Sequence, residues 1–391
     1  MAIFAMSMMV QSACALTIIR NFLGGTPPTN FLGSGSLQTT FNYACDIWEN
    51  AILDDYTLTL NYRWAPVGGA QHELIIQGGN PNRETEGIIE VNNDDIAGHF
   101  TWFLDPEPWN NHGQTNIIEE FVDLGGGVIN GSRRVEWSQT HNYCELLPTL
   151  LHEIGHSLGL SYGNLLFEQL SVNAVIDITS PRPFAGSVVP LNTNIYGVVS
   201  HIAQVVNSGR TLMHSQVGYG ELNWPSDLDI LTLAQLSQFT NVNFGISPVL
   251  KISHQTDVEL SWLQVLGQWK LQQSTNLRDW VTLDSSATPN TNGWYSVLLQ
   301  TTGRDFFRLI RTDTPSRSTN IFPFPASIKA SSIRSTKESA CRYNSIGHKS
   351  GALLPVYRAR LERQQRQRAF SPEALADANR RVAEEKANCK L

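Results

Sequence analysis

Three absences narrow what this sequence can encode. No stretch approaches the ~20 apolar residues that a membrane-spanning helix requires, so no such helix is expected. None of the five cysteines forms a Cys-x-x-Cys pair, which argues against a thiolate zinc site. No Lys or Arg precedes Arg20, so the apolar residues 1–15 lack the positive start that is typical of a signal peptide.

The first fifteen residues nevertheless have one strong signal-peptide feature. They end in Ser12-Ala13-Cys14-Ala15, which fits a small-x-small cleavage site and predicts a secreted or periplasmic protein. A buried N-terminal strand or helix is the alternative. Removal of Cys14 would leave four cysteines, an even number that suits an oxidising compartment. The pairs we expect are Cys45–Cys144 and Cys341–Cys389, with four unpaired thiols as the alternative.

Charge is unevenly distributed along the chain. Residues 316–391 hold 15 Lys or Arg and 6 Asp or Glu, a net charge of +9; because the whole chain carries −7, residues 1–315 carry −16. Because residues 1–315 are acidic, we expect no nucleic-acid partner. We expect residues 315–391 to form a basic, largely disordered tail with a helix beginning at Ser371, or else a partner-binding arm.

The first 245 residues show an α+β pattern. Residues 41–53 have apolar side chains at helical spacing, and Ser226 is placed to cap a second helix. Between them lie apolar or alternating runs that predict strands. These runs are residues 56–62, 74–76, 87–91 and 101–106. We therefore expect an α+β domain over residues 16–245 after the signal segment 1–15.

A second module is expected over residues 248–314. Short alternating runs at roughly ten-residue spacing predict a small β-sandwich. The runs are residues 258–262, 268–272, 280–283 and 306–309. Trp262, Trp269 and Trp280 favour core packing over sugar binding. The module is similar to the fibronectin-type-III-like sandwiches of secreted bacterial enzymes, which implies a spacer or an attachment to a surface or polymer.

The clearest chemical signal is His152-Glu153-Ile154-Gly155-His156. At positions i and i+4 of a helix, the two imidazoles leave the same face and can bind one Zn²⁺, and Glu153 can act as general base on a water. About 0.01 HExxH strings would be expected by chance at this composition. The predicted helix covers residues 146–160, and Gly159 is the expected point where the chain turns out of it.

A zinc hydrolase usually has three protein ligands, and the third is not adjacent here. The pattern HExxHxxGxxH would place a histidine at 162, where the chain has Tyr162. Downstream lie Val199-Ser200-His201 and then Thr211-Leu212-Met213-His214-Ser215. On these segments, residues 17–243 resemble the metzincin metalloproteases, in the leishmanolysin-like arrangement with an insertion before the third histidine. The resemblance implies that His201 is the third zinc ligand and that Met213 lies in the Met-turn below the metal.

Other residues compete for the third position. His214 directly follows Met213 and could itself face the metal, Tyr162 could bind as a phenolate, and Glu168 or Glu221 would complete a His₂Glu site. Tyr219 and His214 are candidates for stabilising an oxyanion. The remaining histidines have no spacing partner and are expected to be surface or satisfied core residues.

These features predict a secreted zinc-dependent endopeptidase. Its partners would be protein or peptide substrates, with no nucleic acid and no membrane span. The alternative is a catalytically silent zinc-binding protein of the same fold, used for adhesion or binding. Retention of Glu153 favours the enzyme, because a structural zinc site needs no general base.

Overall fold

The computed structural model of the 391-residue chain describes part of it, and all structural statements below concern that part. Contacts divide the chain into residues 1–345 and 346–391. Residues 346–391, the segment 1–14 and the helix expected from Ser371 lie outside the described residues. The described residues are 15–93, 101–110, 117–124, 127–135, 143–171, 175–178, 187–192, 200–203, 206, 210–254, 257–283, 289–290, 292–299, 305–313, 316–323 and 340–342.

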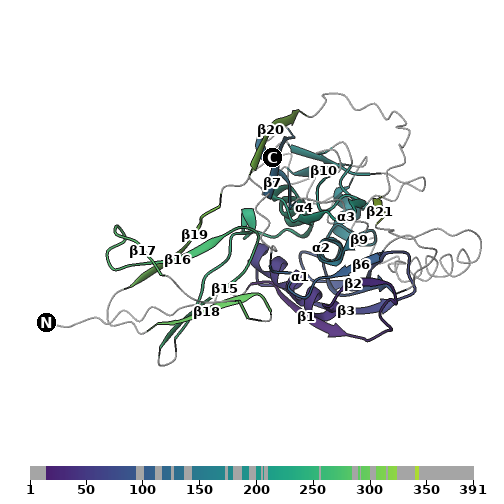
Figure 1. The fold of residues 1–391 in the computed structure, drawn as a ribbon. Helices are drawn as coiled ribbons and strands as arrows, with labels where there is room; N and C mark the ends of the chain where they lie inside the picture. Colours follow the sequence, from purple (N-terminus) through teal and green to yellow (C-terminus); the bar gives the residue numbers. More distant parts are fainter. Residues whose placement is uncertain are drawn as a thin grey trace, which may run out of the picture. The chain divides into compact units, whose positions relative to one another are not determined.

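The first helix, α1 (Leu37–Ala51), begins four residues before the predicted start. Ser36 explains the difference, because its side chain accepts a hydrogen bond from the backbone N–H of Thr39 and caps the helix. Eleven of the fifteen residues of α1 are buried. The helix packs against the first sheet and against α2 (Figure 1). Trp48 Nε1 donates to the carbonyl of Leu151 at 2.9 Å.

The sheet beside α1 contains the strands predicted between residues 56 and 91. Its order is β1 (Thr17–Phe22), β3 (Thr57–Ala65), β5 (Arg83–Asn92) and β4 (Ala70–Gly78). Strands β1, β3 and β5 are parallel, whereas β4 is antiparallel to β5 and lies at the end of the sheet. Even residues of β3 are buried, whereas the odd residues from 57 to 63 are exposed or half-buried, as the alternating sequence predicted.

Three further helices follow in the sequence. Helix α2 (Leu146–Ser157) is buried along its whole length and ends three residues before the predicted end. Two residues later comes Gly159, whose φ of 134° is unfavourable for a residue with a side chain. Helix α3 (Leu165–Leu170) is short and is capped by Asn164. Helix α4 (Asp227–Ser237) begins with the predicted cap, and Ser226 and Asp229 form a complete capping box.

Small sheets complete this part of the chain. One has the order β2 (Phe31–Gly33), β6 (Thr101–Leu104), β9 (Tyr143–Glu145), and another the order β13 (Leu222–Trp224), β8 (Val128–Val135), β7 (Ile117–Asp123), β20 (Ser316–Pro323). Two-stranded pairs are β10 (Val175–Ile178) with β11 (Ser187–Pro190), and β12 (Gln216–Gly218) with β21 (Ala340–Arg342). Because β20 and β21 belong to sheets, two segments of the tail expected to be disordered are strands.

The predicted C-terminal strands form two three-stranded sheets. One has the order β14 (Lys251–His254), β15 (Val258–Leu263), β18 (Trp294–Leu299), and the other β17 (Val281–Thr282), β16 (Trp269–Ser274), β19 (Phe306–Arg311). We call residues 251–311 the C-terminal sandwich. It has its own small core of Val258, Leu260, Trp262 and Leu271.

The sandwich is not isolated from the preceding residues. A short 3-10 helix, η3 (Phe244–Ile246), leads into it. Leu263, Val265 and Leu266 belong to the main core cluster, and Tyr43 Oη of α1 donates to the carbonyl of Gln264 at 2.6 Å. The predicted boundary at residues 245–248 stays a prediction, because described residues on both sides of it share one core.

The tryptophans of the sandwich are engaged in packing. Trp262 is buried and stacks on Tyr295 with ring centroids 5.2 Å apart. Trp269 is half-buried against the main core, and the guanidinium of Arg308 lies 4.0 Å from the Trp280 ring centroid. The packing interpretation therefore agrees with the burial of Trp262, whereas Trp269 and Trp280 are half-buried.

Two cysteines are described with their side chains, and they do not pair with each other. Cys45 is a free, buried thiol of α1, while Cys144 of β9 is disulfide-bonded. The expected Cys45–Cys144 pair is therefore wrong. Cys45 lies among the apolar side chains of the main hydrophobic core. The expected Cys341–Cys389 pair stays a prediction, because Cys389 lies outside the described residues. Among the described helices, none combines the length and apolar character needed to span a membrane.

Candidate metal centre

Three histidines converge in the interior beside α2. His152 and His156 lie one turn apart on α2, and His201 comes from the segment between β11 and β12. One ligand nitrogen of each lies within 4.8 Å of the other two, and each side chain is at least nine-tenths buried. We call His152, His156 and His201 the histidine triad. It is the group of metal-ligating residues that the described part of the chain brings together.

Each imidazole of α2 is oriented by a backbone carbonyl. His152 Nδ1 lies 2.7 Å from the carbonyl oxygen of Leu212, and His156 Nδ1 lies 2.5 Å from that of Leu160. With the protons on Nδ1, both Nε2 atoms present lone pairs, and they lie 3.0 Å apart. His201 Nε2 is buried without a hydrogen-bond partner. Two oriented lone pairs and one orphaned nitrogen fit a metal ion bound by three nitrogens.

Electrostatics keep the triad neutral. Burial lowers the pKa of His156 to about 3, and burial with neighbouring histidines holds the pKa of His152 and of His201 well below the usual value. A histidine binds a metal ion only as neutral imidazole. The triad is thus in the ligating protonation state at neutral pH.

The turn at Leu212 and Met213 helps to fix the position of His201. The backbone N–H of Ile202, next to His201, donates to the carbonyl of Met213 at 2.9 Å. Gly155 permits this turn to approach α2, because a Cβ there would lie 2.4 Å from Met213 Sδ. The Asp229 carboxylate accepts hydrogen bonds from the backbone N–H groups of Leu212 and Met213, so the cap of α4 also fixes the turn.

Glu153 follows His152 directly on α2. Its side chain is buried, and burial raises the pKa of its carboxyl to about 8. The backbone of His72 on β4 opposes that rise in pKa in part. A buried carboxyl with a raised pKa, on the helix that carries two of the histidines, can exchange protons with a water or an amine.

The competing residues stand differently. His214 is buried and interacts electrostatically with His152 and His201, but it is outside the group that could share one ion. Tyr162 is 44% exposed, and Glu168 and Glu221 are not part of the group either. The structure thus brings His201 to the two histidines of α2.

Sequence reasoning missed two neighbours of the centre. His72 Nε2 lies 2.8 Å from Glu84 Oε1, and both side chains are buried. Burial lowers the pKa of His72 to about 3 and raises that of Glu84, so the two groups form a neutral hydrogen bond. The prediction that His72 is a satisfied core residue agrees with this contact, but nothing in the sequence pairs it with Glu84.

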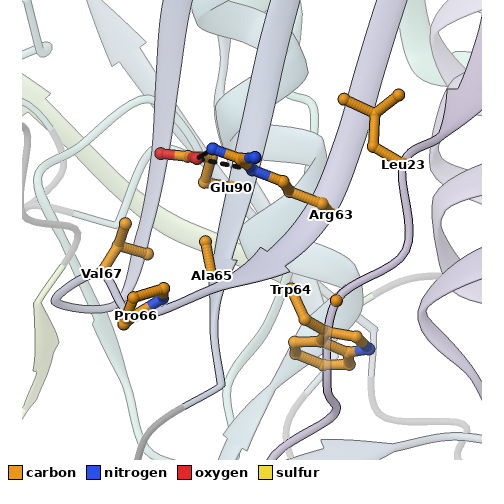
Figure 2. A pocket seen from close by; sticks show the side chains of 8 residues that line it. Leu23, Arg63, Trp64, Ala65, Pro66, Val67 and Glu90 are labelled. Atoms are coloured by element: carbon orange, nitrogen blue, oxygen red, sulfur yellow. Dashed lines mark hydrogen bonds and ion pairs between the residues drawn. The ribbon is translucent and has the colours of Figure 1, made fainter.

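A separate pocket lies on the sheet away from the triad. It is lined by Leu23, Gly25, Arg63, Trp64, Ala65, Pro66, Val67 and Glu90. Figure 2 shows the Arg63 guanidinium directed at the Glu90 carboxylate, and the two form an ion pair. Opposite charges therefore neutralise each other in the pocket, and no described triad residue lines it.

Comparison with known proteins adds no assignment: no family model, curated protein or solved structure matches this chain. The site must therefore be interpreted from its own geometry.

Proposed function

We propose that this protein is a zinc-dependent endopeptidase of metzincin-like type. The observation that carries the proposal is the convergence of three buried, neutral imidazoles, two of them on the helix that also carries the buried carboxyl of Glu153. Three nitrogen ligands with one open position are the usual donor set of catalytic zinc. Zinc is the metal we propose, because imidazole nitrogens in a buried site suit it better than they suit calcium or magnesium.

The chain's own residues would perform the proton transfers. Zinc, when bound in such a site, supplies Lewis-acid polarisation of a carbonyl and makes a water more acidic. Glu153 accepts a proton from the attacking water as general base and then donates that proton to the leaving amine. Because the site is buried, the charges that develop in this step are poorly screened by solvent.

The proposed partners and location follow from the same reading. The substrate is a protein or peptide, and the C-terminal sandwich would serve as a spacer or as attachment to a surface or polymer. A disulfide at Cys144 supports an oxidising, extracellular or periplasmic location. The acidic charge of residues 1–315 supports a protein that does not bind nucleic acid.

One observation favours a second function, a catalytically silent zinc-binding protein. His214 is buried close enough to affect the charge of His152 and His201. If it moved to the metal as a fourth ligand, the site would be closed and would serve structure or adhesion.

The experiment is cleavage of an unfolded, fluorescently labelled protein by the full chain loaded with zinc. We expect wild type to cleave it and Glu153→Ala to be at least about a thousandfold slower, because the proton acceptor is lost. Glu90→Ala is the matched control and should cleave like wild type. Equal cleavage by Glu153→Ala would contradict the role of Glu153, and inactive wild type with one bound zinc would favour the silent protein.

A further inference from the structure

The segment after α2 supplies the carbonyl that orients one metal ligand. Helix α2 ends at Ser157, and we call residues 158–161 the return turn. His156 Nδ1 lies 2.5 Å from the carbonyl oxygen of Leu160 in this turn. A bound metal ion needs the Nε2 lone pair of His156, so the proton must stay on Nδ1, where the Leu160 carbonyl accepts it. The position of this carbonyl therefore affects how well His156 can bind a metal ion.

The backbone of the return turn is irregular. Its first two N–H groups, those of Leu158 and Gly159, still donate to carbonyls of α2 at 3.0 and 3.1 Å. Gly159 then has a φ of 134°, a conformation that favours glycine. A glycine adds backbone freedom directly before Leu160, so contacts from outside the turn are needed to hold the Leu160 carbonyl in one place.

One such contact comes from the end of α4. Ser237, the last residue of this helix, donates from Oγ to the carbonyl of Leu158 at 2.6 Å, and both side chains are buried. The two segments approach closely, because a Cβ at Gly159 would lie 2.6 Å from Ser237 Oγ. Position 159 thus requires glycine for its φ and also for the space that admits the Ser237 hydroxyl.

Arg83 of β5 fixes Ser237 in turn. Its Nε donates to the carbonyl of Ser237 at 2.6 Å, and its Nη2 donates to that of Gln238 at 3.0 Å. The last carbonyls of a helix have no partner within the helix, so these two bonds hold the end of α4. The Arg83 guanidinium also lies 4.5 Å from the centroid of the Phe239 ring. Ser237 is therefore a fixed donor beside the return turn.

We propose that Ser237 is a positioning residue of the metal centre, whose hydroxyl holds the return turn so that the Leu160 carbonyl keeps His156 in the metal-binding tautomer. The inference rests on the proposed function, because it assigns Ser237 a part in building the zinc site. Hydrogen-bond partners of a ligating histidine typically contribute about 10–100-fold to metal affinity. Ser237 acts one step farther away, through the turn, so we expect its effect at the lower end of this range.

The test measures the zinc affinity of the full-length protein by competition with a chelating dye. We expect Ser237→Ala to raise the Kd for zinc about tenfold, and Ser237→Thr, which retains a hydroxyl, to stay within about threefold of wild type. Thr232→Val is the matched control. Thr232 is fully buried in the same helix, and its Oγ1 donates to the carbonyl of Leu228 at 2.8 Å. The control removes the same kind of hydrogen bond away from the return turn and should leave Kd within about twofold.

A second measurement needs neither zinc nor activity. NMR of nitrogen-labelled imidazoles in the metal-free chain distinguishes a histidine with its proton on Nδ1 from one with its proton on Nε2. We expect the Nδ1–H form of His156 in wild type and in Thr232→Val, and a mixture of both forms in Ser237→Ala. A loss of overall stability alone would not change the tautomer in the folded chain, so this measurement separates positioning from a purely structural role.

The outcomes separate the two proposals. If Ser237→Ala fails to fold, Arg83→Met loosens the end of α4 from the other side and should shift Kd and tautomer in the same direction. Unchanged Kd and tautomer in the folded variants, with one zinc bound to wild type, would overturn the positioning role alone, and so would an equal loss in Thr232→Val. A wild type that binds no zinc, with a shifted His156 tautomer in Ser237→Ala, would overturn the zinc proposal and leave the link from Ser237 to His156 intact.

Discussion

The metal-centre region and the C-terminal sandwich bury different kinds of side chain. Around α2 the interior holds the side chains of five histidines, Glu84, Glu153 and Asp229, whereas the sandwich core consists of Val258, Leu260, Trp262 and Leu271. Buried polar groups cost free energy unless they are paired, and apolar groups stabilise by leaving water. The buried polar groups of the first region therefore cost it stability, whereas the apolar core of the second region stabilises the fold.

The two regions also differ in how their side chains are held. Each imidazole of α2 is anchored to a carbonyl, and the turn at Met213 is anchored to Asp229. In the sandwich core, stacking of Trp262 on Tyr295 and apolar contacts provide the order. Substitutions in the first region should thus change function more than folding, and substitutions in the second should do the reverse.

The largest expected effect is on metal affinity. His201→Ala removes one of three nitrogen ligands, so the Kd for zinc should rise by about a thousandfold or more. His214→Ala should leave Kd within about tenfold of wild type. The measurement is competition with a chelating dye. Equal losses in both variants would point to a four-histidine site and to the silent protein.

Acid should destabilise the metal-free protein through the buried histidines. Their folded-state pKa lies below the unfolded value near 6.5, so the unfolded chain takes up protons first and stability is lost as pH falls below 6.5. For His72 and His156, whose pKa is about 3, the loss between pH 7 and pH 5 is about 2 kcal/mol each. Urea unfolding at both pH values checks this. In the His72→Phe variant, which lacks one of these histidines, the loss of stability between pH 7 and pH 5 should be smaller.

A cavity in the sandwich core should affect stability without affecting the metal. Leu260 is fully buried, and Leu260→Ala should lower the free energy of unfolding by about 2–4 kcal/mol. At a temperature where the variant is folded, its zinc Kd should equal that of wild type. Denaturant titration and metal competition measure the two quantities. A changed Kd would show that the regions are coupled more tightly than their shared contacts suggest.

The smallest effect is a gain in stability at Glu145. Burial raises the pKa of this carboxyl to about 8, with Asp105 adding to the shift, and Glu145 Oε1 has no hydrogen-bond partner. Ionisation of Glu145 therefore lowers the free energy of unfolding as pH rises above about 4.3, its pKa in the unfolded chain. This loss grows up to about pH 8. Glu145→Gln should be more stable than wild type by about 1–3 kcal/mol at pH 8 and equal to it near pH 4. Thermal unfolding across that range is the measurement.

Helix α2 was predictable because the residues that define it lie close together in the sequence. His152 and His156 are four residues apart, and the apolar residues before them mark a buried helix. Strands β3 and β5 and helix α4 were predictable for the same reason, since alternation and capping are patterns within a few residues. His201 was predicted only through the resemblance to the metzincins, because spacing alone left several rival residues.

Other features depend on pairing between distant residues. Strands β7 and β8 escaped prediction because ion pairs replace apolar residues in their buried positions, as with Glu120 and Arg134, whose side chains lie 2.9 Å apart. The His72–Glu84 contact joins two strands, and it depends on their register and on the space at Gly87. Such a register between distant strands cannot be predicted from a single sequence.

The most direct test of the central claim is the zinc content and coordination of the purified full chain. X-ray absorption at the zinc edge counts the nitrogen and oxygen neighbours of the ion. Our account predicts one zinc per chain with three imidazole nitrogens and one non-protein oxygen, and loss of one nitrogen in His201→Ala. A fourth imidazole, or a chain that binds no zinc at neutral pH, would contradict it.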